Sequence, residues 1–205
     1  TQNRTFVAIK TATTIDGKIA TFSNNSKWIT SDYARNEVRN IRKKYDAILT
    51  SSSTIIADNP TMAHKCKVIL DRELKTDLNG EIYKQGKIYV FHACSPEKKN
   101  TNNRITFIPT PCTNKKLDIG HILKKLYELG VMSVLVESGG ALNESFLPYA
   151  DKLYHFIAPK ILGDNNGKSC FYGKAVQNIS DCTDLEFESF ASFPPDILLT
   201  YNKKV

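Results

Sequence analysis

The feature that most constrains the fold is the alternation of short apolar runs with amphipathic segments along the first two thirds of the chain. Ala34, Val38, Ile41 and Tyr45 recur at helical spacing, and Ser31 is placed to cap that helix. The apolar run Asp46–Thr50 follows almost directly, and such alternation is typical of an α/β fold. The strands that we expect in this part of the chain are Phe6–Thr13, Asp46–Thr50, Lys67–Asp71, Lys87–Phe91, Ile105–Ile108 and Ser133–Glu137.

The last third of the chain follows a different pattern. Further helices are expected at Ser52–Ala57, at Asp118–Leu129 with its leucines inward and Gly130 as its stop, and after Gly139-Gly140. Beyond that point, the strands Lys152–Ala158, Asp184–Phe190 and Ile197–Asn202 have no helices between them, which favours an antiparallel edge or hairpin. We therefore predict an α/β fold with a mixed, mostly parallel sheet, formed as one domain over residues 1–205.

Composition excludes several classes of protein. The chain has 205 residues and a formal net charge of +7, but its lysines are dispersed, which favours attraction of small phosphorylated substrates over nucleic-acid binding. Its five cysteines are odd in number and widely spaced, so neither a disulfide framework nor a zinc site is indicated. We expect reduced thiols, no metal, no membrane segment and a cytoplasmic location.

Residues 10–62 carry the first signal of a ligand. Trp28, the only tryptophan, lies in a long polar loop over residues 14–29, and loops of this length usually have a function. A hydroxyl cluster, Ser51–Thr54, stands between a strand and a helix, where capping alone requires one hydroxyl. An anionic ligand accounts for both features. The simpler interpretations are that Trp28 is a half-buried anchor and that the hydroxyl cluster caps the helix.

Two glycine-containing turns differ in whether they indicate a phosphate-binding site. Gly139-Gly140 follows a buried strand that ends in Glu137 and precedes a helix, which is suitable geometry for a pyrophosphate, although a tight turn is the commoner reason for a double glycine. The segment Gly163–Ser169 resembles a P-loop, but it is one residue short between its glycines and starts no helix. We interpret it as a surface turn. His155 is interpreted as structural.

These residues together resemble the reductase domain of riboflavin biosynthesis, which in many bacteria is the C-terminal half of a bifunctional deaminase–reductase. The resemblance covers nearly the whole chain, in order. Its motifs are Lys10, Thr14–Lys18, Ser26–Thr30, Ala34-Arg35, Arg42, Asp46–Leu49, Thr54, Ala57–Pro60, Val136–Gly140 and Ile157–Gly163. It implies a dihydrofolate-reductase-like fold, NADPH as cofactor and a phosphoribosylaminouracil as substrate.

The resemblance also implies roles for individual residues. Cofactor-binding positions are Ala12, Trp28, Thr54, Asp58 and the turn of Gly139, Gly140, Ala141, Leu142, Asn143, Glu144 and Ser145. Substrate-binding positions are Ser26, Arg42, Met62, Lys65 and Glu137. Where the family commonly has Leu-Thr-x-Arg, this chain has Met62–Lys65, and a lysine lacks the bidentate fork of arginine. The Ser95–Lys99 loop is a candidate for binding a 2′-phosphate.

The implied reaction is reduction of a ribosyl side chain to a ribityl chain. It requires the sugar ring to open to an imine and a hydride to reach the anomeric carbon, with no covalent enzyme intermediate. Lys10, Asp58 and Glu137 are the candidate proton donors, and the sequence does not choose among them. The resemblance implies a homodimer. The deaminase zinc motif is missing from the sequence, so we expect a stand-alone reductase or one half of a split pair whose deaminase is a separate chain.

Two rival functions remain from the sequence. A dihydrofolate reductase would share the fold and the cofactor, but the phosphate-handling residues Ser26, Arg42 and Lys65 favour a phosphorylated substrate. A basic nucleic-acid-binding protein rests on net charge alone and ranks last. Preference for NADPH over NADH, and reduction after deamination, are expectations from the resemblance.

Overall fold

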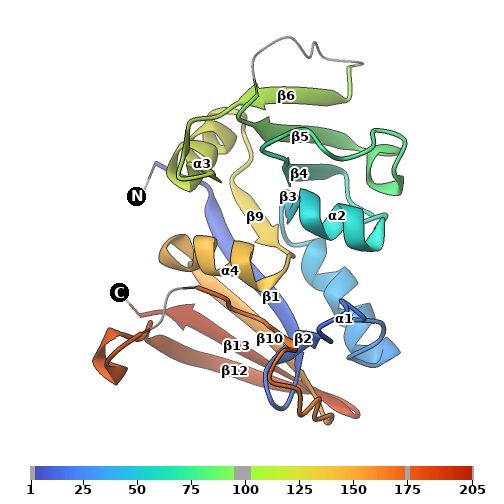
Figure 1. The fold of residues 1–205 in the computed structure, drawn as a ribbon, viewed down its shortest axis with the longest axis vertical. Helices are drawn as coiled ribbons and strands as arrows, with labels where there is room; N and C mark the ends of the chain where they lie inside the picture. The colour runs from blue at the N-terminus through green and yellow to red at the C-terminus, as the bar shows by residue number, and fades with distance from the viewer. Residues whose placement is uncertain (1–2, 95–102, 174–175, 205) are drawn as a thin grey trace. The chain divides into compact units, whose positions relative to one another are not determined.

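The computed structural model describes residues 3–94, 103–173 and 176–204 (Figure 1). Backbone contacts divide the chain into two compact units. Unit 1 comprises Thr1–Phe6 and Arg42–Ser138, and unit 2 comprises Val7–Ile41 and Gly139–Val205. Each unit contributes its own strands and helices, and the chain returns to unit 2 after completing unit 1.

Unit 1 is built on five parallel strands in the order β9-β3-β4-β5-β6. Figure 1 shows β4, β5 and β6 side by side. Every residue of β4 is buried, which is the pattern of a parallel strand covered on both faces. The strands are β3 (Ala47–Ser51), β4 (Cys66–Leu70), β5 (Lys87–His92), β6 (Ile105–Pro109) and β9 (Ser133–Val136).

The other elements of unit 1 connect these strands. They are α2 (Ser52–Asp58), α3 (Ile119–Glu128), the 3-10 helix η1 (Glu81–Tyr83) and the short strands β7 (Cys112–Thr113) and β8 (Lys116–Leu117). Asp118 caps α3 by accepting a hydrogen bond from His121 N (2.9 Å), and Gly130 follows with φ +79°. The expected stop of this helix is confirmed. Leu129 was expected inward but is exposed, because the helix ends one residue before it.

A lysine lies inside the core of unit 1. Lys67, in the middle of the buried strand β4, has a side chain only 2% exposed. Its Nζ donates hydrogen bonds to the carbonyl oxygens of Ile82 (2.6 Å) and Gln85 (2.9 Å). Burial, and to a smaller degree the charge of Arg104, lowers the pKa of Lys67. The lysine therefore fixes η1 and the turn after it to the sheet.

Unit 2 carries a mixed sheet in the order β12-β13-β10-β1. β1 (Phe6–Thr14) pairs in parallel with β10 (Lys152–Ala158). β10 pairs antiparallel with β13 (Asp196–Lys203), which pairs antiparallel with β12 (Leu185–Phe193). The expected antiparallel hairpin at the end of the chain is confirmed, and the α/β prediction with a mixed, mostly parallel pairing pattern is confirmed as well.

Helix α1 (Asp32–Arg42) begins as the sequence predicted. Ser31 caps it by accepting a hydrogen bond from Ala34 N (3.3 Å), and the stripe of Ala34, Val38 and Ile41 is buried. Asp196, at the start of β13, accepts a hydrogen bond from Ser31 N (2.7 Å). The last hairpin of the chain is thus tied to the first turn of α1.

The polar loop over residues 14–29 is more ordered than expected. It contains a short strand, β2 (Lys18–Ala20), which pairs antiparallel with β11 (Lys168–Ser169). The Asp16 carboxylate accepts hydrogen bonds from Leu162 N (3.0 Å) and Gly163 N (2.9 Å). The remaining elements of unit 2 are α4 (Gly140–Phe146), η2 (Leu147–Tyr149) and η3 (Ile179–Asp181).

Two kinds of feature are absent from the residues that the structure describes. No helix in this part of the chain is long and apolar enough to cross a membrane. No group of three or more histidine, cysteine, aspartate or glutamate side chains is placed to hold a metal ion within the same residues.

Candidate functional site

The expected site residues fall into two sets, one in each unit. Unit 1 holds Arg42, Thr54, Asp58, Met62, Lys65 and Glu137, and unit 2 holds Lys10, Ala12, Ser26, Trp28 and the turn Gly139–Ser145. The Ser95–Lys99 loop lies outside the described residues.

In unit 1, Arg42 and Glu137 form a bidentate ion pair. Arg42 Nε donates to Glu137 Oε1 (2.6 Å), and Arg42 Nη2 donates to Oε2 (2.9 Å). Glu137 follows β9, and its backbone N–H donates to Leu49 O (2.9 Å), which fixes it beside the end of β3. Burial disfavours the charge of Arg42, but the hydrogen bonds and charge of Glu137 outweigh it and raise the pKa of Arg42. Two residues that the sequence assigned separately to a substrate therefore form one ion pair.

A network of hydroxyl groups lies at the start of α2. Ser51 caps the helix, and its Oγ is 3.1 Å from Thr54 Oγ1 and 2.9 Å from Ser53 Oγ. Ser138 completes the network, at 2.7 Å from Ser51 Oγ and 3.1 Å from Thr54 Oγ1. Because a hydroxyl rotates to donate or accept, this network is able to turn donors toward a polar ligand. Sequence reasoning missed Ser138, although its place between Glu137 and the double glycine was a signal.

The three site residues expected at the end of α2 and in the segment after it differ in burial. Asp58 is the last residue of α2, and Asn59 ends the helix in the left-handed region with φ 40°. Met62 is buried in a hydrophobic cluster with Ile55 and Ile69, so its side chain serves the core. Lys65 is exposed and immediately precedes β4. Of the three expected residues, Asp58 is half-buried, Met62 is buried and Lys65 is exposed.

The close packing beside Lys65 depends on Gly86, which sequence reasoning did not select. Gly86 has φ +78°, and a Cβ there would lie 2.7 Å from His64 O and 2.9 Å from Lys65 O. A side chain at this position would push the Lys65 backbone away. Gly86 therefore holds the segment that presents Lys65.

In unit 2, Lys10 and Ala12 lie on the same face of β1, because they are two residues apart on one strand. They are in register with Tyr154 and Phe156 of β10. Lys10 Nζ is 5.8 Å from the centroid of the Phe156 ring, which favours a cation over an aromatic face. Ala12 has no polar side chain, so any hydrogen bond that it makes to a ligand comes from its backbone.

Trp28 is exposed but held in place. Its side chain is 63% exposed, with the Arg35 guanidinium 4.4 Å from its ring centroid. Lys160 Nζ donates to Trp28 O (2.7 Å). Ser26, two residues earlier, is half-buried. An indole that packs against one guanidinium, on a backbone held by Lys160, and that is open to solvent is suited to pack against a flat ring.

The glycine turn of unit 2 packs against the chain itself. A Cβ on Gly140 would lie 2.2 Å from Ser169 O, whereas nothing lies within 4 Å of a Cβ on Gly139. Tyr172 N donates to Gly140 O (3.1 Å), and Asn143 Nδ2 donates to Cys170 O (2.9 Å). The close approach that the sequence predicted is thus made at Gly140 by residues 169–172, while Gly139 remains open.

The segment that resembled a P-loop is not one. Lys168 and Ser169 form the strand β11, and no helix follows over residues 170–173. His155 Nε2 lies 2.8 Å from Thr13 Oγ1, and burial lowers the pKa of His155. Both interpretations from the sequence agree with these contacts.

Comparison with known sequences gives a consistent result. The model of the RibD C-terminal domain family matches residues 5–199. The riboflavin biosynthesis protein RibD of Actinobacillus pleuropneumoniae is 32% identical over 213 residues, covering 97% of this chain and 57% of that protein. The 5-amino-6-(5-phosphoribosylamino)uracil reductase of Buchnera aphidicola subsp. Acyrthosiphon pisum is 32% identical over 208 residues, covering 89% of this chain and 98% of that protein. The chain therefore spans little more than half of the RibD relative and nearly all of the reductase.

Solved structures agree with the fold. A deaminase/5-amino-6-(5-phosphoribosylamino)uracil reductase of Thermotoga maritima superposes with a TM-score of 0.86 at 29% identity, covering 99% of this chain and 58% of that one. Dihydrofolate reductase from Enterococcus faecalis superposes with a TM-score of 0.54 at 12% identity, covering 98% and 97%. The second likeness concerns the fold alone, and it confirms the expected dihydrofolate-reductase-like architecture.

Proposed function

Because this chain belongs to the RibD C-terminal domain family, we propose that it is a reductase of riboflavin biosynthesis. It reduces the ribosyl side chain of 5-amino-6-(5-phosphoribosylamino)uracil to a ribityl chain, with NADPH as the hydride donor. The observation that carries this proposal is the similarity to the Buchnera reductase, which extends over 98% of that protein. The two units would together form one reductase domain over residues 1–205.

The residues present fit a nicotinamide dinucleotide. Trp28 presents an exposed aromatic surface, Thr54 belongs to a hydroxyl network, and Gly139 leaves space beside the first turn of α4. These groups would bind the nicotinamide, the polar linking groups and the pyrophosphate respectively, and Ala12 would contribute its backbone. Asp58 and the rest of the turn, Ala141 to Ser145, are assigned to the same cofactor. When bound, NADPH supplies the hydride.

The substrate phosphate is assigned to cations of unit 1. Glu137 occupies Nε and one Nη2 hydrogen of Arg42, so Arg42 would contact a phosphate through Nη1. Lys65 is exposed and would add a point charge in place of the family's arginine. Ser26 would donate its hydroxyl to the substrate, and Met62, with its side chain in the core, would contact it mainly through the backbone.

Catalysis in this proposal is positioning and proton transfer. The sugar ring opens to an imine at its anomeric carbon, and that opening needs a proton donor near the sugar. Lys10, Asp58 and Glu137 are the candidates, and Glu137 is already committed to Arg42. Lys10 and Glu137 would orient the open-chain sugar. Turnover of Lys10→Ala within about threefold of the wild-type rate would remove Lys10 from this role.

The test follows NADPH oxidation with freshly prepared 5-amino-6-(5-phosphoribosylamino)uracil. Parallel reactions use its undeaminated diamino precursor, dihydrofolate, and NADH in place of NADPH. Oxidation with the deaminated uracil alone supports the proposal and places reduction after deamination. Oxidation with dihydrofolate alone keeps the fold and overturns the substrate, and oxidation with neither substrate overturns the reductase assignment for the chain by itself.

The same proposal includes the setting of the enzyme. We assign it a homodimeric state and a cytoplasmic location, with deamination as the step that precedes its reaction. Addition of a deaminase to the assay should let this chain and NADPH convert the diamino precursor to the ribityl product, whereas this chain and NADPH alone should leave that precursor unreduced. Salt-dependent binding of nucleic acid without NADPH binding would favour the basic binding protein instead.

A further inference from the structure

Residues 160–173 of unit 2, which we call the strap, lie against both groups of residues that unit 2 is proposed to offer the cofactor. One group is the polar loop over residues 14–29, which carries Trp28, and the other is the glycine turn, Gly139–Ser145. All three segments belong to unit 2, so their contacts lie within one compact unit. The function proposed above gives the strap itself no role.

The first residues of the strap hold the start of the polar loop. The two carboxylate oxygens of Asp16 accept one strap N–H each, from Leu162 (3.0 Å) and from Gly163 (2.9 Å). Ile15 N, beside Asp16, donates to Lys160 O (2.8 Å). Hydrogen bonds to an ionised carboxylate are stronger than those between neutral groups. Asp16 is therefore the side chain that ties the loop to this end of the strap.

The same end of the strap reaches Trp28. Lys160 Nζ donates a hydrogen bond to Trp28 O (2.7 Å), so the strap holds the tryptophan by its backbone. The indole ring is held from α1, where the Arg35 guanidinium lies 4.4 Å from the ring centroid and Nη1 donates to Thr30 O (2.6 Å). The orientation of the exposed indole thus depends on the strap as well as on α1.

The other end of the strap joins the polar loop to the glycine turn through one residue. Cys170 N donates to Gly17 O (3.3 Å), and Cys170 O accepts from Asn143 Nδ2 (2.9 Å). The Asn143 side chain is fully buried, and Tyr172 N donates to Gly140 O (3.1 Å). A displacement of the strap at this point would therefore move the loop and the turn together.

We propose that the strap positions the cofactor-binding elements of unit 2, and that Asp16 and Lys160 are positioning residues that act through it. The inference rests on the proposed binding of NADPH. Neither residue is among the positions assigned to the cofactor, and both Asp16 oxygens already accept N–H groups of the strap. An effect of Asp16 on cofactor affinity would therefore pass through the strap.

The proposal predicts a particular kinetic signature. Without its contacts to the strap, the polar loop would occupy the binding-competent arrangement for only a fraction of the time, and the apparent dissociation constant rises as the inverse of that fraction. Saturating NADPH selects the competent arrangement again, so kcat is retained. A merely structural defect would instead reduce the amount of active protein, which lowers kcat and leaves the affinity of the folded fraction unchanged.

The experiment measures NADPH binding by titration calorimetry in the absence of substrate. Asp16→Ala should raise the dissociation constant at least about fivefold, while kcat at saturating NADPH and substrate stays within about threefold of wild type. Asp164→Ala is the matched control: the Asp164 carboxylate accepts from Asn166 N (2.8 Å), which joins the strap only to itself. Its dissociation constant should stay within about twofold of wild type.

A second pair of variants tests the contact with Trp28. Lys160→Met removes the donor to Trp28 O and should raise the dissociation constant for NADPH about threefold. Lys160→Arg keeps a cationic donor of similar length and should return the value to within about twofold of wild type. A value for Lys160→Met equal to that of wild type would remove Lys160 from the positioning role.

The outcomes separate this inference from the function on which it rests. A wild type that does not bind NADPH overturns the proposed cofactor and the positioning role with it. A wild type that binds, with Asp16→Ala binding equally well or with kcat lost and affinity kept, overturns the positioning role alone. If Asp16→Ala loses its native circular dichroism, Asp16→Asn replaces it, and because one acceptor oxygen remains, a rise of at least about twofold is expected.

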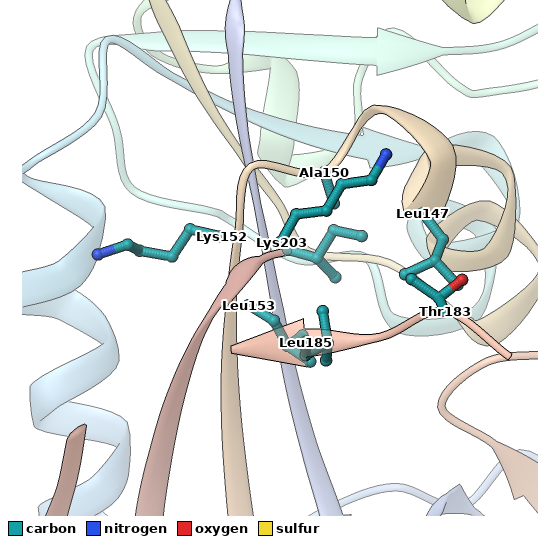
Figure 2. A pocket seen from close by; sticks show the side chains of 8 residues that line it. Leu147, Ala150, Lys152, Leu153, Thr183, Leu185 and Lys203 are labelled. Carbon is teal, nitrogen blue, oxygen red and sulfur yellow. The ribbon is translucent and has the colours of Figure 1, made fainter. Parts of the chain in front are cut away.

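Hydrogen exchange on the wild type gives a reading without variants. The amides of Leu162, Gly163 and Cys170 donate across the contacts of the strap, so saturating NADPH should slow their exchange. Leu185 is the internal reference. It lines the hollow of about 250 Å³ in Figure 2, none of whose eight lining residues belongs to the strap, the polar loop or the glycine turn. Equal changes at Leu185 and at the strap amides, or none at the strap, would overturn the proposal.

Discussion

Gly140 and Gly139 are adjacent, and the structure predicts opposite results when each is changed to alanine. A Cβ on Gly140 would lie 2.2 Å from Ser169 O and 3.3 Å from the Cys170 carbonyl carbon, both backbone atoms. Residues 169–170 would have to move by roughly 1 Å to reach van der Waals distance. Overpacking of this kind costs about 1–3 kcal/mol. The hydrogen bonds Tyr172 N to Gly140 O and Asn143 Nδ2 to Cys170 O would weaken as well, at about 1 kcal/mol each.

We therefore expect Gly140→Ala to lower the free energy of unfolding by about 2–4 kcal/mol. Gly139→Ala is the control, since nothing lies within 4 Å of its Cβ and its φ of −75° suits any residue. Alanine is a poorer N-cap than glycine but restricts the unfolded chain, so the net change should stay within about 1 kcal/mol. Urea unfolding followed by circular dichroism measures both. Equal stability of the two variants, within about 0.5 kcal/mol, would refute the packing argument.

Three further predictions concern charged side chains. Arg42→Met should destabilise the fold by roughly 3–5 kcal/mol, because it removes the bidentate partner of the buried Glu137 carboxylate. Adding Glu137→Met should recover much of the loss, and a coupling energy near zero in the urea double-mutant cycle would show that the pair is not structural. Burial lowers the pKa of Lys67, so just below pH 10.5 the folded state binds fewer protons than the unfolded state. The free energy of unfolding of the wild type should therefore rise with pH in that range. Urea titrations at several pH values should show no such rise for Lys67→Met. Hydrogen bonds from the Thr14 side chain and from Leu162 N and Gly163 N hold the pKa of Asp16 well below its usual range. The free energy of unfolding should therefore fall as the pH drops below 3.8. In the same assay, Asp16→Asn should show a weaker dependence on acid pH.

Local patterns predicted much of this fold. The stripe of Ala34, Val38 and Ile41 predicted α1 because a helix repeats its buried face within a few residues, and Ser31 and Gly130 marked helix ends by backbone chemistry. The pairing of β2 with β11 was missed, since strands of two or three residues show no alternation and their partners lie about 150 residues apart. Short elements of this kind are determined by tertiary contacts, which local sequence does not contain.

The candidate site shows the same division. Sequence reasoning selected both Arg42 and Glu137, but their 95-residue separation hid the ion pair that joins them. Gly140 was expected to make room for a ligand, and its close neighbour is Ser169 O of the same chain. Met62 was selected as a substrate-binding residue from its position in a motif, and its side chain is buried in the hydrophobic core. Residue types were predictable, whereas the partners of each side chain required the fold.

The single tryptophan is an intrinsic fluorescent probe at a known position in the fold. Trp28 belongs to unit 2, and its emission depends on the stacked Arg35 and on the loop that Lys160 holds. Circular dichroism, in contrast, sums over the helices and strands of both units. Fluorescence and dichroism recorded on one urea titration therefore compare one unit with the whole chain, and coincident midpoints would mean that the two units unfold as one cooperative body.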